Sequence, residues 1–380
     1  MKKFIILAHS ANHYFKLAEF LNKKNLLHKI ISIYPKFRVK VYKLPRDRVK
    51  FLFFPFLIFM IKKFLKFNIS NIFYSDILNF SSKFYLQNKN AKILICSSGY
   101  CLKSIQKARK ENILSVVDRA CPHIEYQKKL IFNELDKLPI LNPNKIKKNY
   151  FDNKIIDQML KEYDQCDFIS VPSNFSYNSF RSYGLEKKLI FNQLTPEKIL
   201  NLKNTKNKNN DELEIFSIGF NFIRKGFYYL IEAMKLLENT KIKLNLRTIK
   251  PDFLDIRNIP NNVNLIEKHI SNKELENYYN NADLIILPSI DEGFGMVALE
   301  AMCLKKPVLI TQNVGMKDVL TKYLKNSENY IINPGNIEEL TNKILNIYDN
   351  KAKLVDEGNL FFQAANKYLE KDIFKGYINL

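Results

Sequence analysis

The sequence predicts an α/β protein with two parallel sheets. Three observations support this fold class. Short apolar runs alternate with amphipathic stretches, several runs are apolar throughout, and a Lys- and Asn-rich segment at 201–213 separates five runs from six. Alternating strands and helices form parallel sheets covered by helices, and strands buried on both faces lack polar alternation. Two Rossmann-like domains that face each other across a ligand cleft are the simplest arrangement.

The predicted strands follow in chain order. They cover residues 4–8, 29–34, 93–98, 114–120 and 168–173 in the first half, and 214–220, 243–249, 263–267, 284–289, 307–311 and 330–334 in the second. The stretch from 226 to 237 shows the helical pattern between strands, with Phe227, Leu230 and Met234 on one face. Residues 201–213 show no apolar periodicity and are expected to be a linker or surface loop.

Composition indicates a globular protein that attracts anions. The 380 residues are 46% hydrophobic and 26% charged, with a net charge of +22. Such a charge favours nucleic acid, an anionic membrane surface or phosphorylated ligands. The five cysteines include no C-x-x-C pair and no zinc spacing, so we expect reduced thiols, no metal site and a cytoplasmic location. The first apolar run has only five residues, which suits a strand better than a secretory leader.

The stretch FLFFPFLIFMIKKFLKF, residues 51–67, allows two interpretations. Its unbroken apolar run has eleven residues, whereas a membrane-spanning helix needs about 20. Basic residues flank the run: Arg46, Arg48 and Lys50 precede it, and Lys62, Lys63 and Lys66 lie in its last part. A helix lying in an anionic membrane interface fits residues 46–67. A core helix whose lysines extend to water fits equally well.

The stretch DEGFGMVALEAM, residues 291–302, contains glycines that fit two motifs. Read as G-x-G-x-x-A, it suggests a dinucleotide-binding turn of an NAD(P)-dependent enzyme. That motif requires an acidic residue at the end of the next strand to bind a ribose hydroxyl. Gln312 and Asn313 stand there instead, so this interpretation is disfavoured.

The other interpretation is a site for a nucleotide sugar. Gly293 and Gly295 let the backbone approach a ligand, and their amides, with those of Phe294 and Met296, form an anion site at a helix start. Glu292 lies just outside this site. The Glu300 side chain leans back toward it, because helical side chains tilt toward the N-terminus. Two carboxylates that can accept hydrogen bonds from hydroxyls, one on each side of a phosphate site, match a nucleotide sugar, which has a sugar ring and a ribose joined by a diphosphate.

A second cluster, SIGFNFIRKGFYYLIEAMKLL, has the same strand–loop–helix order. The strand ends at Gly219, and Arg224 and Lys225 stand just before the next helix. Cations at a helix start oppose the helix dipole unless an anion binds there. We therefore expect Arg224 and Lys225 to neutralise charge on a leaving diphosphate.

These motifs resemble a known family. The segment NADLIILPSIDEGFGMVALEAMCLKKPVLITQNVG resembles the signature of retaining glycosyltransferases of family 4, which have the GT-B fold. The resemblance implies that Glu292 contacts the donor sugar and Glu300 the nucleotide ribose. Gly219 and Lys225 also match the family pattern, whereas Phe220 stands where the family usually has arginine, and Arg224 is the candidate replacement.

The resemblance also implies an organisation and an activity. Residues 1–194 would bind the acceptor, residues 195–364 would bind the donor, and residues 365–380 would pack back on the first domain. The expected enzyme moves a sugar from a UDP- or GDP-sugar to an acceptor hydroxyl with retention of configuration, without a metal or other cofactor. The acceptor is expected to be a saccharide or lipid-linked saccharide of the cell envelope. A nucleic-acid-binding protein is the alternative that the charge favours, although no recognition motif appears.

Candidate residues on the acceptor side follow the first-half strands. The resemblance implies a histidine near the donor sugar and the reaction centre, and His123, near Arg119 after the fourth strand, is the candidate. Its loop at the carboxyl end of a strand is where functional sites gather. The remaining candidates line the ends of the first and third strands: His9, Ser10, Asn12, Ser98 and Gly99.

Overall fold

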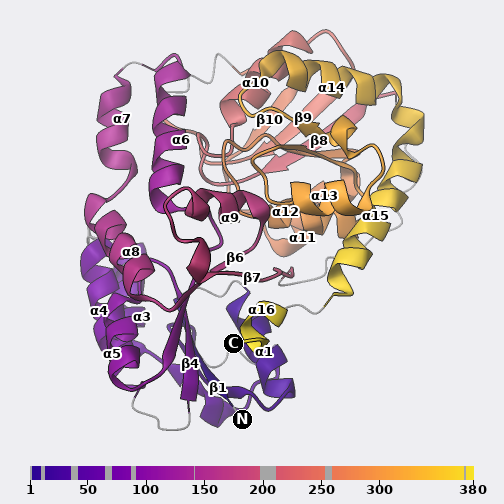
Figure 1. Ribbon diagram of the computed structural model, residues 1–380. Coiled ribbons are helices and arrows are strands. Elements are labelled where there is room, and N and C mark those ends of the chain that lie inside the picture. Colours follow the sequence, from indigo (N-terminus) through magenta and orange to yellow (C-terminus); the bar gives the residue numbers. More distant parts are fainter. Residues whose placement is uncertain are drawn as a thin grey trace.

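The computed structural model describes residues 2–9, 13–35, 42–64, 71–86, 91–140, 142–196, 211–252, 259–371 and 374–380. It contains two parallel sheets with helices packed around them (Figure 1). The sheet of the N-terminal half has the strand order β3-β2-β1-β4-β5-β6-β7, and that of the C-terminal half has the order β10-β9-β8-β11-β12-β13. The predicted α/β class with two parallel sheets is therefore confirmed.

The N-terminal half begins with β1. Its strands are β1 (Lys3–Ala8), β2 (Leu27–Ser32), β3 (Val49–Phe51), β4 (Ala91–Ser97), β5 (Leu114–Asp118), β6 (Phe168–Val171) and β7 (Leu189–Phe191). Its helices are α1 (Tyr14–Lys23), α3 (Phe53–Phe64), α4 (Asn71–Lys83), α5 (Leu102–Lys110), α6 (Ile124–Lys137), α7 (Pro143–Tyr150), α8 (Asn153–Gln165) and α9 (Asn174–Arg181).

The C-terminal half begins with β8. Its strands are β8 (Leu213–Ile218), β9 (Ile242–Arg247), β10 (Val263–Ile266), β11 (Leu284–Leu287), β12 (Val308–Thr311) and β13 (Ile331–Ile332). Its helices are α10 (Phe227–Leu236), α11 (Asn272–Asn281), α12 (Met296–Cys303), α13 (Lys317–Tyr323), α14 (Ile337–Asp349) and α15 (Leu354–Leu369), and α16 (Lys375–Ile378) ends the chain. All eleven predicted strands are present. The sequence analysis missed β3 and β7, which have three residues each.

Helices α6 and α7 reach from the N-terminal half to the C-terminal half. In Figure 1, α6 stands between α7 and α10. Ile131 and Leu135 of α6 share one buried apolar cluster with Tyr229 of α10 and Ile290, which follows β11. Apolar burial of this kind stabilises the contact between the halves.

The C-terminal segment also joins the halves. In α15, the Tyr368 hydroxyl accepts a hydrogen bond from the Leu194 amide at 3.1 Å and donates to the Leu194 carbonyl oxygen at 2.9 Å. Helix α16 lies beside α1 in the N-terminal half (Figure 1), and Tyr377 donates to Asp118 Oδ1 at 2.7 Å. Most of the expected linker, residues 201–210, lies outside the described residues. The domain boundaries at 194 and 364 stay predictions.

Candidate active site

The loop between β11 and α12 carries the E-G-F-G sequence and is held against the loop after β12. The Glu292 amide donates to the Asn313 carbonyl at 3.0 Å, and the Gly315 amide donates to the Glu292 carbonyl at 2.9 Å. Gly295 begins α12 with φ 96°, a left-handed conformation that favours glycine. These bonds fix the backbone of Glu292 at the carboxyl edge of the sheet.

The same loop lies directly on the N-terminal half. A β-carbon at Gly293 would lie 1.9 Å from the Ala120 carbonyl oxygen, so only glycine fits there. The Gly293 carbonyl accepts a hydrogen bond from Ser173 Oγ at 2.6 Å. The site is therefore built at a close contact between the two halves.

Backbone amides with free N–H groups lie at the start of α12. Among the described residues, the amides of 293–296 donate to no acceptor. Unpaired amides at a helix start, together with the helix dipole, form a site for an anion. The phosphate site expected from the sequence at these amides stays a prediction.

A charge cluster lies beside these amides. Glu292 Oε2 pairs with Lys225 Nζ and lies 3.3 Å from an Arg224 guanidinium nitrogen. Burial raises the pKa of Glu292, but Lys225 and Arg224 offset this effect, so the pKa lies below its ordinary value. Glu292 is therefore an ionised carboxylate with two cationic partners.

The loop after β8 positions the two cations. Gly226 has φ 66°, and a β-carbon there would lie 2.0 Å from the Pro288 carbonyl oxygen. The Arg224 carbonyl accepts from the Ile290 amide at 2.9 Å. A β-carbon at Gly219 would lie 2.8 Å from the Lys225 side chain. The loops after β8 and β11 thus pack directly on each other, because these strands are neighbours in the sheet.

Sequence reasoning missed two polar residues that connect the halves. Asp291 is fully buried, and its Oδ1 accepts a hydrogen bond from Gln127 Nε2 of α6 at 2.9 Å. Gln127 Oε1 in turn accepts from Arg119 at 3.0 Å, and Arg224 lies 3.5 Å from Asp291 Oδ1. Burial, partly offset by Arg224, raises the pKa of Asp291. No motif signalled this bridge, because its members lie far apart in the sequence.

Glu300 is placed one turn inside α12. Its Oε2 accepts a hydrogen bond from the Tyr279 hydroxyl of α11 at 3.0 Å. The structure therefore brings Glu292, Arg224 and Lys225 into contact, whereas Glu300 is held separately by Tyr279.

His123 is buried at the start of α6. It is 2% exposed, its Nδ1 accepts from the Glu125 amide at 3.2 Å, and its ring stacks on Tyr183 at 3.9 Å. Burial, followed by the nearby Arg119 charge, lowers the pKa of His123 to about 4. His123 is thus a neutral helix cap close to the Ala120–Gly293 contact, and its role at the reaction centre stays a prediction.

The other acceptor-side candidates are spread over the ends of β1 and β4. The His9 ring lies 4.0 Å from that of Tyr100 in a tilted arrangement, and burial lowers the pKa of His9 to about 4. Ser98 Oγ donates to the Tyr163 hydroxyl at 3.3 Å, and the Gly99 amide donates to Glu162 at 2.6 Å, so both residues are tied to α8. Ser10 and Asn12 lie outside the described residues.

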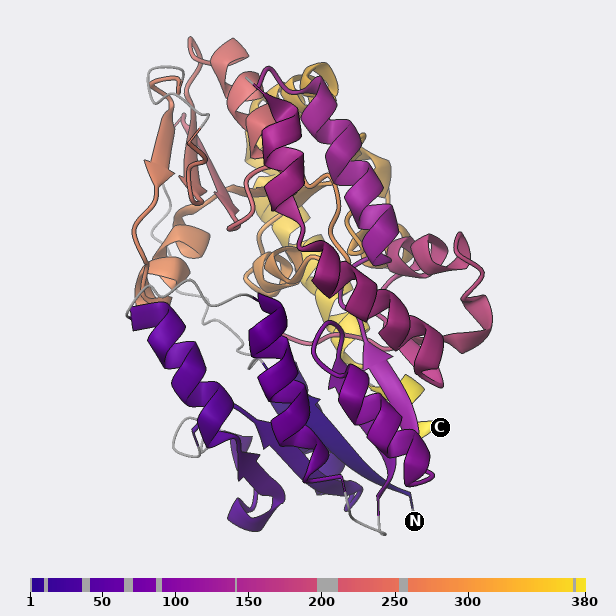
Figure 2. The same ribbon diagram turned by 90° about the vertical axis from the view of Figure 1, so that its left-hand side faces the viewer.

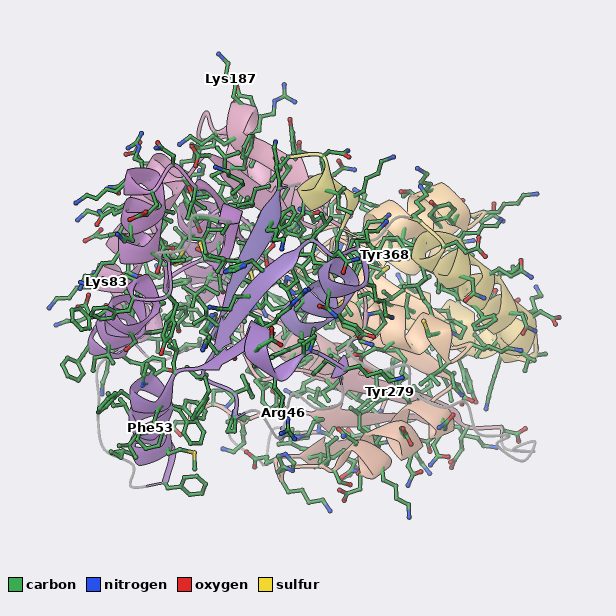
Figure 3. All side chains as sticks on the ribbon, turned by 90° about the horizontal axis from the view of Figure 1, so that it is seen from below. Arg46, Phe53, Lys83, Lys187, Tyr279 and Tyr368 are labelled. Carbon is green, nitrogen blue, oxygen red and sulfur yellow. The ribbon has the colours of Figure 1, made fainter. Side chains whose placement is uncertain are left out.

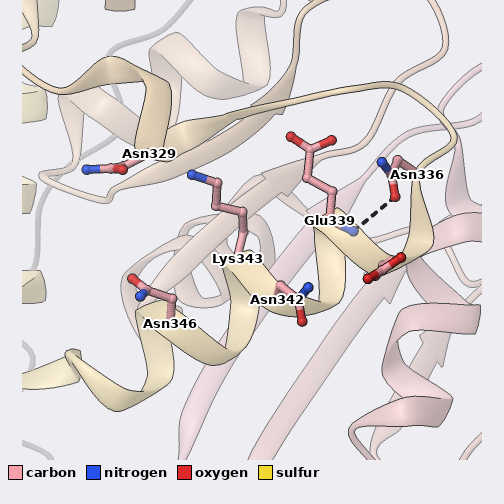
Figure 4. A pocket seen from close by; sticks show the side chains of 7 residues that line it. Asn329, Asn336, Glu339, Asn342, Lys343 and Asn346 are labelled. Atoms are coloured by element: carbon pink, nitrogen blue, oxygen red, sulfur yellow. Dashed lines mark hydrogen bonds between the residues drawn. The ribbon is translucent and has the colours of Figure 1, made fainter.

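Two surface pockets are lined by residues other than those of the charge cluster. One, of about 410 Å³, is lined by polar residues on and near α14, including Asn336, Glu339 and Lys343 (Figure 4). The other, of about 250 Å³, lies between the halves and is lined by Tyr126, Asn178 and other residues. Within the described ranges, no group of His, Cys, Asp or Glu could hold a metal ion.

Comparisons with known proteins show which family the C-terminal half resembles. Residues 198–359 match the family model described as Glycosyl transferases group 1. The match covers less than half of the chain. The chain is 26% identical over 250 residues to the uncharacterized glycosyltransferase MJ1607 of Methanocaldococcus jannaschii, covering 60% of this chain and 63% of that protein. It is 28% identical over 145 residues to the capsular polysaccharide biosynthesis glycosyltransferase CapM of Staphylococcus aureus, covering 36% of each chain.

A solved structure shows the fold of the whole chain. The crystal structure of Anabaena Alr3699/HepE in complex with UDP is similar with a TM-score of 0.64 at 14% identity, covering 96% of this chain and 95% of that chain. The two halves therefore form a GT-B fold. The chain spans less than two thirds of the length of both curated relatives.

Proposed function

We propose that this protein is a glycosyltransferase that moves a sugar from a nucleotide-diphosphate sugar to an acceptor hydroxyl, with retention of configuration and without a metal. The observation that carries the proposal is the contact of Glu292 with Arg224 and Lys225 beside the free amides of 293–296. The group 1 domain match and the UDP held by Alr3699/HepE support a nucleotide donor.

The cluster has the groups that departure of a diphosphate requires. Arg224 and Lys225 would neutralise the charge that develops on the leaving group, and the amides at the start of α12 would bind its oxygens. The bond between the anomeric carbon and the diphosphate oxygen breaks, the acceptor oxygen bonds to that carbon on the same face, and the acceptor proton passes to the departing phosphate. The protein supplies no second nucleophile in this scheme.

Glu292 and Glu300 would bind opposite ends of the donor. Ionised Glu292 accepts hydrogen bonds from sugar hydroxyls, and Glu300, placed by Tyr279, accepts from the ribose. A bound diphosphate would also give Arg224 and Lys225 a second anionic partner. We expect this exchange of partners to leave the Glu292 carboxylate available to the sugar.

We place the acceptor on the N-terminal side of the cleft. His123, Arg119, His9, Ser98 and Gly99 are the proposed acceptor-side residues among those described. The relationship to CapM favours a cell-envelope saccharide, free or lipid-linked, as the acceptor. A lipid-linked acceptor would require a cytoplasmic protein that reaches the inner membrane surface.

A panel of nucleotide sugars tests the proposal. At a ligand concentration of 100 Kd, binding stabilises the native state by about 2.7 kcal/mol, which a thermal shift detects. We expect UDP- or GDP-sugars to raise the melting temperature and to be slowly hydrolysed. No shift with any nucleotide diphosphate or nucleotide sugar, together with steeply salt-dependent DNA binding, would instead favour the nucleic-acid alternative.

Two substitutions separate the glutamate roles. Glu292→Gln should reduce turnover more than nucleotide affinity, whereas Glu300→Gln should weaken nucleotide affinity. Exposed Glu338 on α14 provides the matched control, Glu338→Gln, which should change neither. Equal, negligible effects of the first two substitutions on kcat and on the Kd for UDP or GDP would contradict the assignment.

A further inference from the structure

Helix α4 buries three polar side chains together with Leu78 and exposes two phenylalanines. Its buried face carries Ser75 and Ser82, which bond to the Gly99 carbonyl at 3.0 Å and to Ser104 Oγ at 2.7 Å. Its outer face carries Phe73 and Phe80, which are 54% and 51% exposed. An ordinary surface helix has the opposite arrangement, with its apolar stripe toward the core. The outer face of α4 is therefore built for an apolar environment.

The neighbouring helix α3 also exposes large apolar side chains. Phe53, Leu57 and Phe64 stand at positions i, i+4 and i+11, and they are 58%, 42% and 66% exposed. The spacing places them on one face of the helix. Helix α3 therefore presents an apolar stripe to the outside, while Phe56 of the same helix packs against the core.

We call the exposed apolar side chains of these two helices the aromatic face. It consists of Phe53, Leu57 and Phe64 of α3, Phe73 and Phe80 of α4, and Phe84 just after α4. The helices pack against each other and lie side by side on the outer side of the N-terminal half (Figure 2). Phe53 and Lys83 both project from this side in Figure 3. Large exposed apolar patches of this kind mark interaction sites.

The charges around the aromatic face select its partner. Lys83 Nζ lies 4.2 Å from the Phe80 ring centroid and 5.5 Å from that of Phe84. Aromatic rings beside a lysine suit the boundary between acyl chains and anionic headgroups. A second copy would oppose another Lys83 and another chain of net charge +22, which disfavours self-association. The Lys62 and Lys63 side chains and the whole of Lys66 lie outside the described part of the chain.

We propose that the aromatic face docks on an anionic membrane surface. Within the described residues, no helix is long and apolar enough to span a bilayer, so the contact would lie in the interface. This inference rests on the proposed function at one point only: a lipid-linked acceptor would lie at the same membrane surface. Membrane binding itself is measured without any donor.

Vesicle flotation tests this surface. The intact chain is mixed with vesicles of phosphatidylcholine and phosphatidylglycerol, and with phosphatidylcholine alone. We expect binding to the anionic vesicles, at least tenfold weaker binding of the triple variant Phe73→Ser, Phe80→Ser, Phe84→Ser, and weaker binding of Lys83→Gln. Because the three rings are exposed, the triple variant should keep the wild-type melting temperature.

A matched control uses exposed apolar residues of the other half. Val355 and Leu360 of α15 are 76% and 50% exposed, and Val355→Ser with Leu360→Ser should leave flotation unchanged. Wild-type protein that does not float, or triple-variant protein that floats equally well, would overturn the proposal. A dimer in lipid-free solution that the triple variant abolishes would overturn it in favour of a second copy. Nucleotide-sugar binding measured without vesicles keeps this result separate from the proposed function.

A second, independent observation concerns Arg247 at the end of β9. This side chain is 5% exposed, donates to the Thr248 carbonyl at 3.1 Å and lies 5.1 Å from the Phe220 ring centroid. Among the described residues, no carboxylate forms a salt bridge with it. Burial of a cation without an anionic partner is costly, so such a group suits an anionic ligand.

Arg247 lies beside the proposed donor site. Its carbonyl accepts from the Gly219 amide at 2.9 Å, and it pairs with Ile218, so the ends of β8 and β9 are aligned. We infer that Arg247 binds the diphosphate of the donor and supplies the positive charge that Phe220 lacks. This inference rests on the proposed function.

Calorimetric titration with UDP and with uridine tests Arg247. We expect Arg247→Gln to weaken UDP binding at least tenfold and uridine binding less than twofold, with partial recovery in Arg247→Lys. Arg181→Gln, at an exposed arginine of α9, is the control. If the wild type binds UDP but Arg247→Gln weakens UDP and uridine binding equally, or weakens neither, the role of Arg247 is overturned. A UDP donor is not affected by that result. Absence of UDP binding by the wild type would overturn this inference together with a UDP donor.

Discussion

His123 should make the stability of the protein depend on pH. Burial followed by the Arg119 charge lowers the pKa of His123 to about 4 in the folded chain, whereas an unfolded histidine has a pKa of about 6.5. Below pH 6.5 the unfolded chain therefore binds a proton that the folded chain rejects. Stability is complete above pH 6.5 and falls as the pH drops toward 4. At pH 5 the two pKa values give a loss of about 2 kcal/mol.

The substitution His123→Asn isolates this effect. Asparagine also caps helices through a side-chain oxygen, but it does not titrate. The free energy of urea unfolding is measured at pH 8 and pH 5 by circular dichroism, because the chain contains no tryptophan. The pH-dependent loss should be about 2 kcal/mol smaller in the variant than in the wild type. The lost ring contacts cancel in this double difference.

A control and a contrary result complete the test. Exposed His269 replaced by Asn should leave the pH dependence unchanged. A double difference near zero for His123→Asn would refute the burial argument. If the same variant also loses transfer activity at pH 8 while remaining folded, His123 has the additional role at the reaction centre that the sequence predicts.

Two further predictions concern the contact between the halves. Gly293→Ala places a methyl group 1.9 Å from the Ala120 carbonyl oxygen. Because this displaces the site, we expect kcat/KM to fall on the order of 100-fold. An unchanged kcat/KM would show that the contact does not hold during turnover. Gln127→Leu removes the donor to buried Asp291 and should lower the unfolding free energy by about 1–3 kcal/mol, whereas Gln106→Leu, which breaks an exposed bond, should cost much less in the same urea titration.

The sequence predicted the sheets well because their strands are strongly apolar. Each of the eleven predicted strands belongs to a parallel sheet. The two missed strands, β3 and β7, are three-residue edge strands, which bury too little for a recognisable run. Parallel order also explains why Arg224 and Glu292 could be predicted together, because β8 and β11 are neighbours whose carboxyl ends share one edge.

Contacts that depend on the docking of the two halves could not be predicted. Gln127 and Asp291 are 164 residues apart, and neither lies in a pattern that points to the other. Helix α4 shows a different limit. Its sequence gives no reason to expect Ser75 and Ser82 inside and phenylalanines outside. The burial of both serines beside Leu78, and the bonds that the serines make, show which face is inside.

In the proposed function, the charge cluster would couple donor binding to the contact between the halves. Arg224 is shared between Glu292 of the proposed donor site and Asp291 of the bridge to Gln127. A diphosphate that draws Arg224 away from Asp291 would change the bridge, and binding linkage is reciprocal. A change in the bridge must then alter donor affinity by the same factor. Since Gln127 belongs to the N-terminal half, affinity for the proposed donor would then depend on a residue outside the segment that matches the group 1 family model.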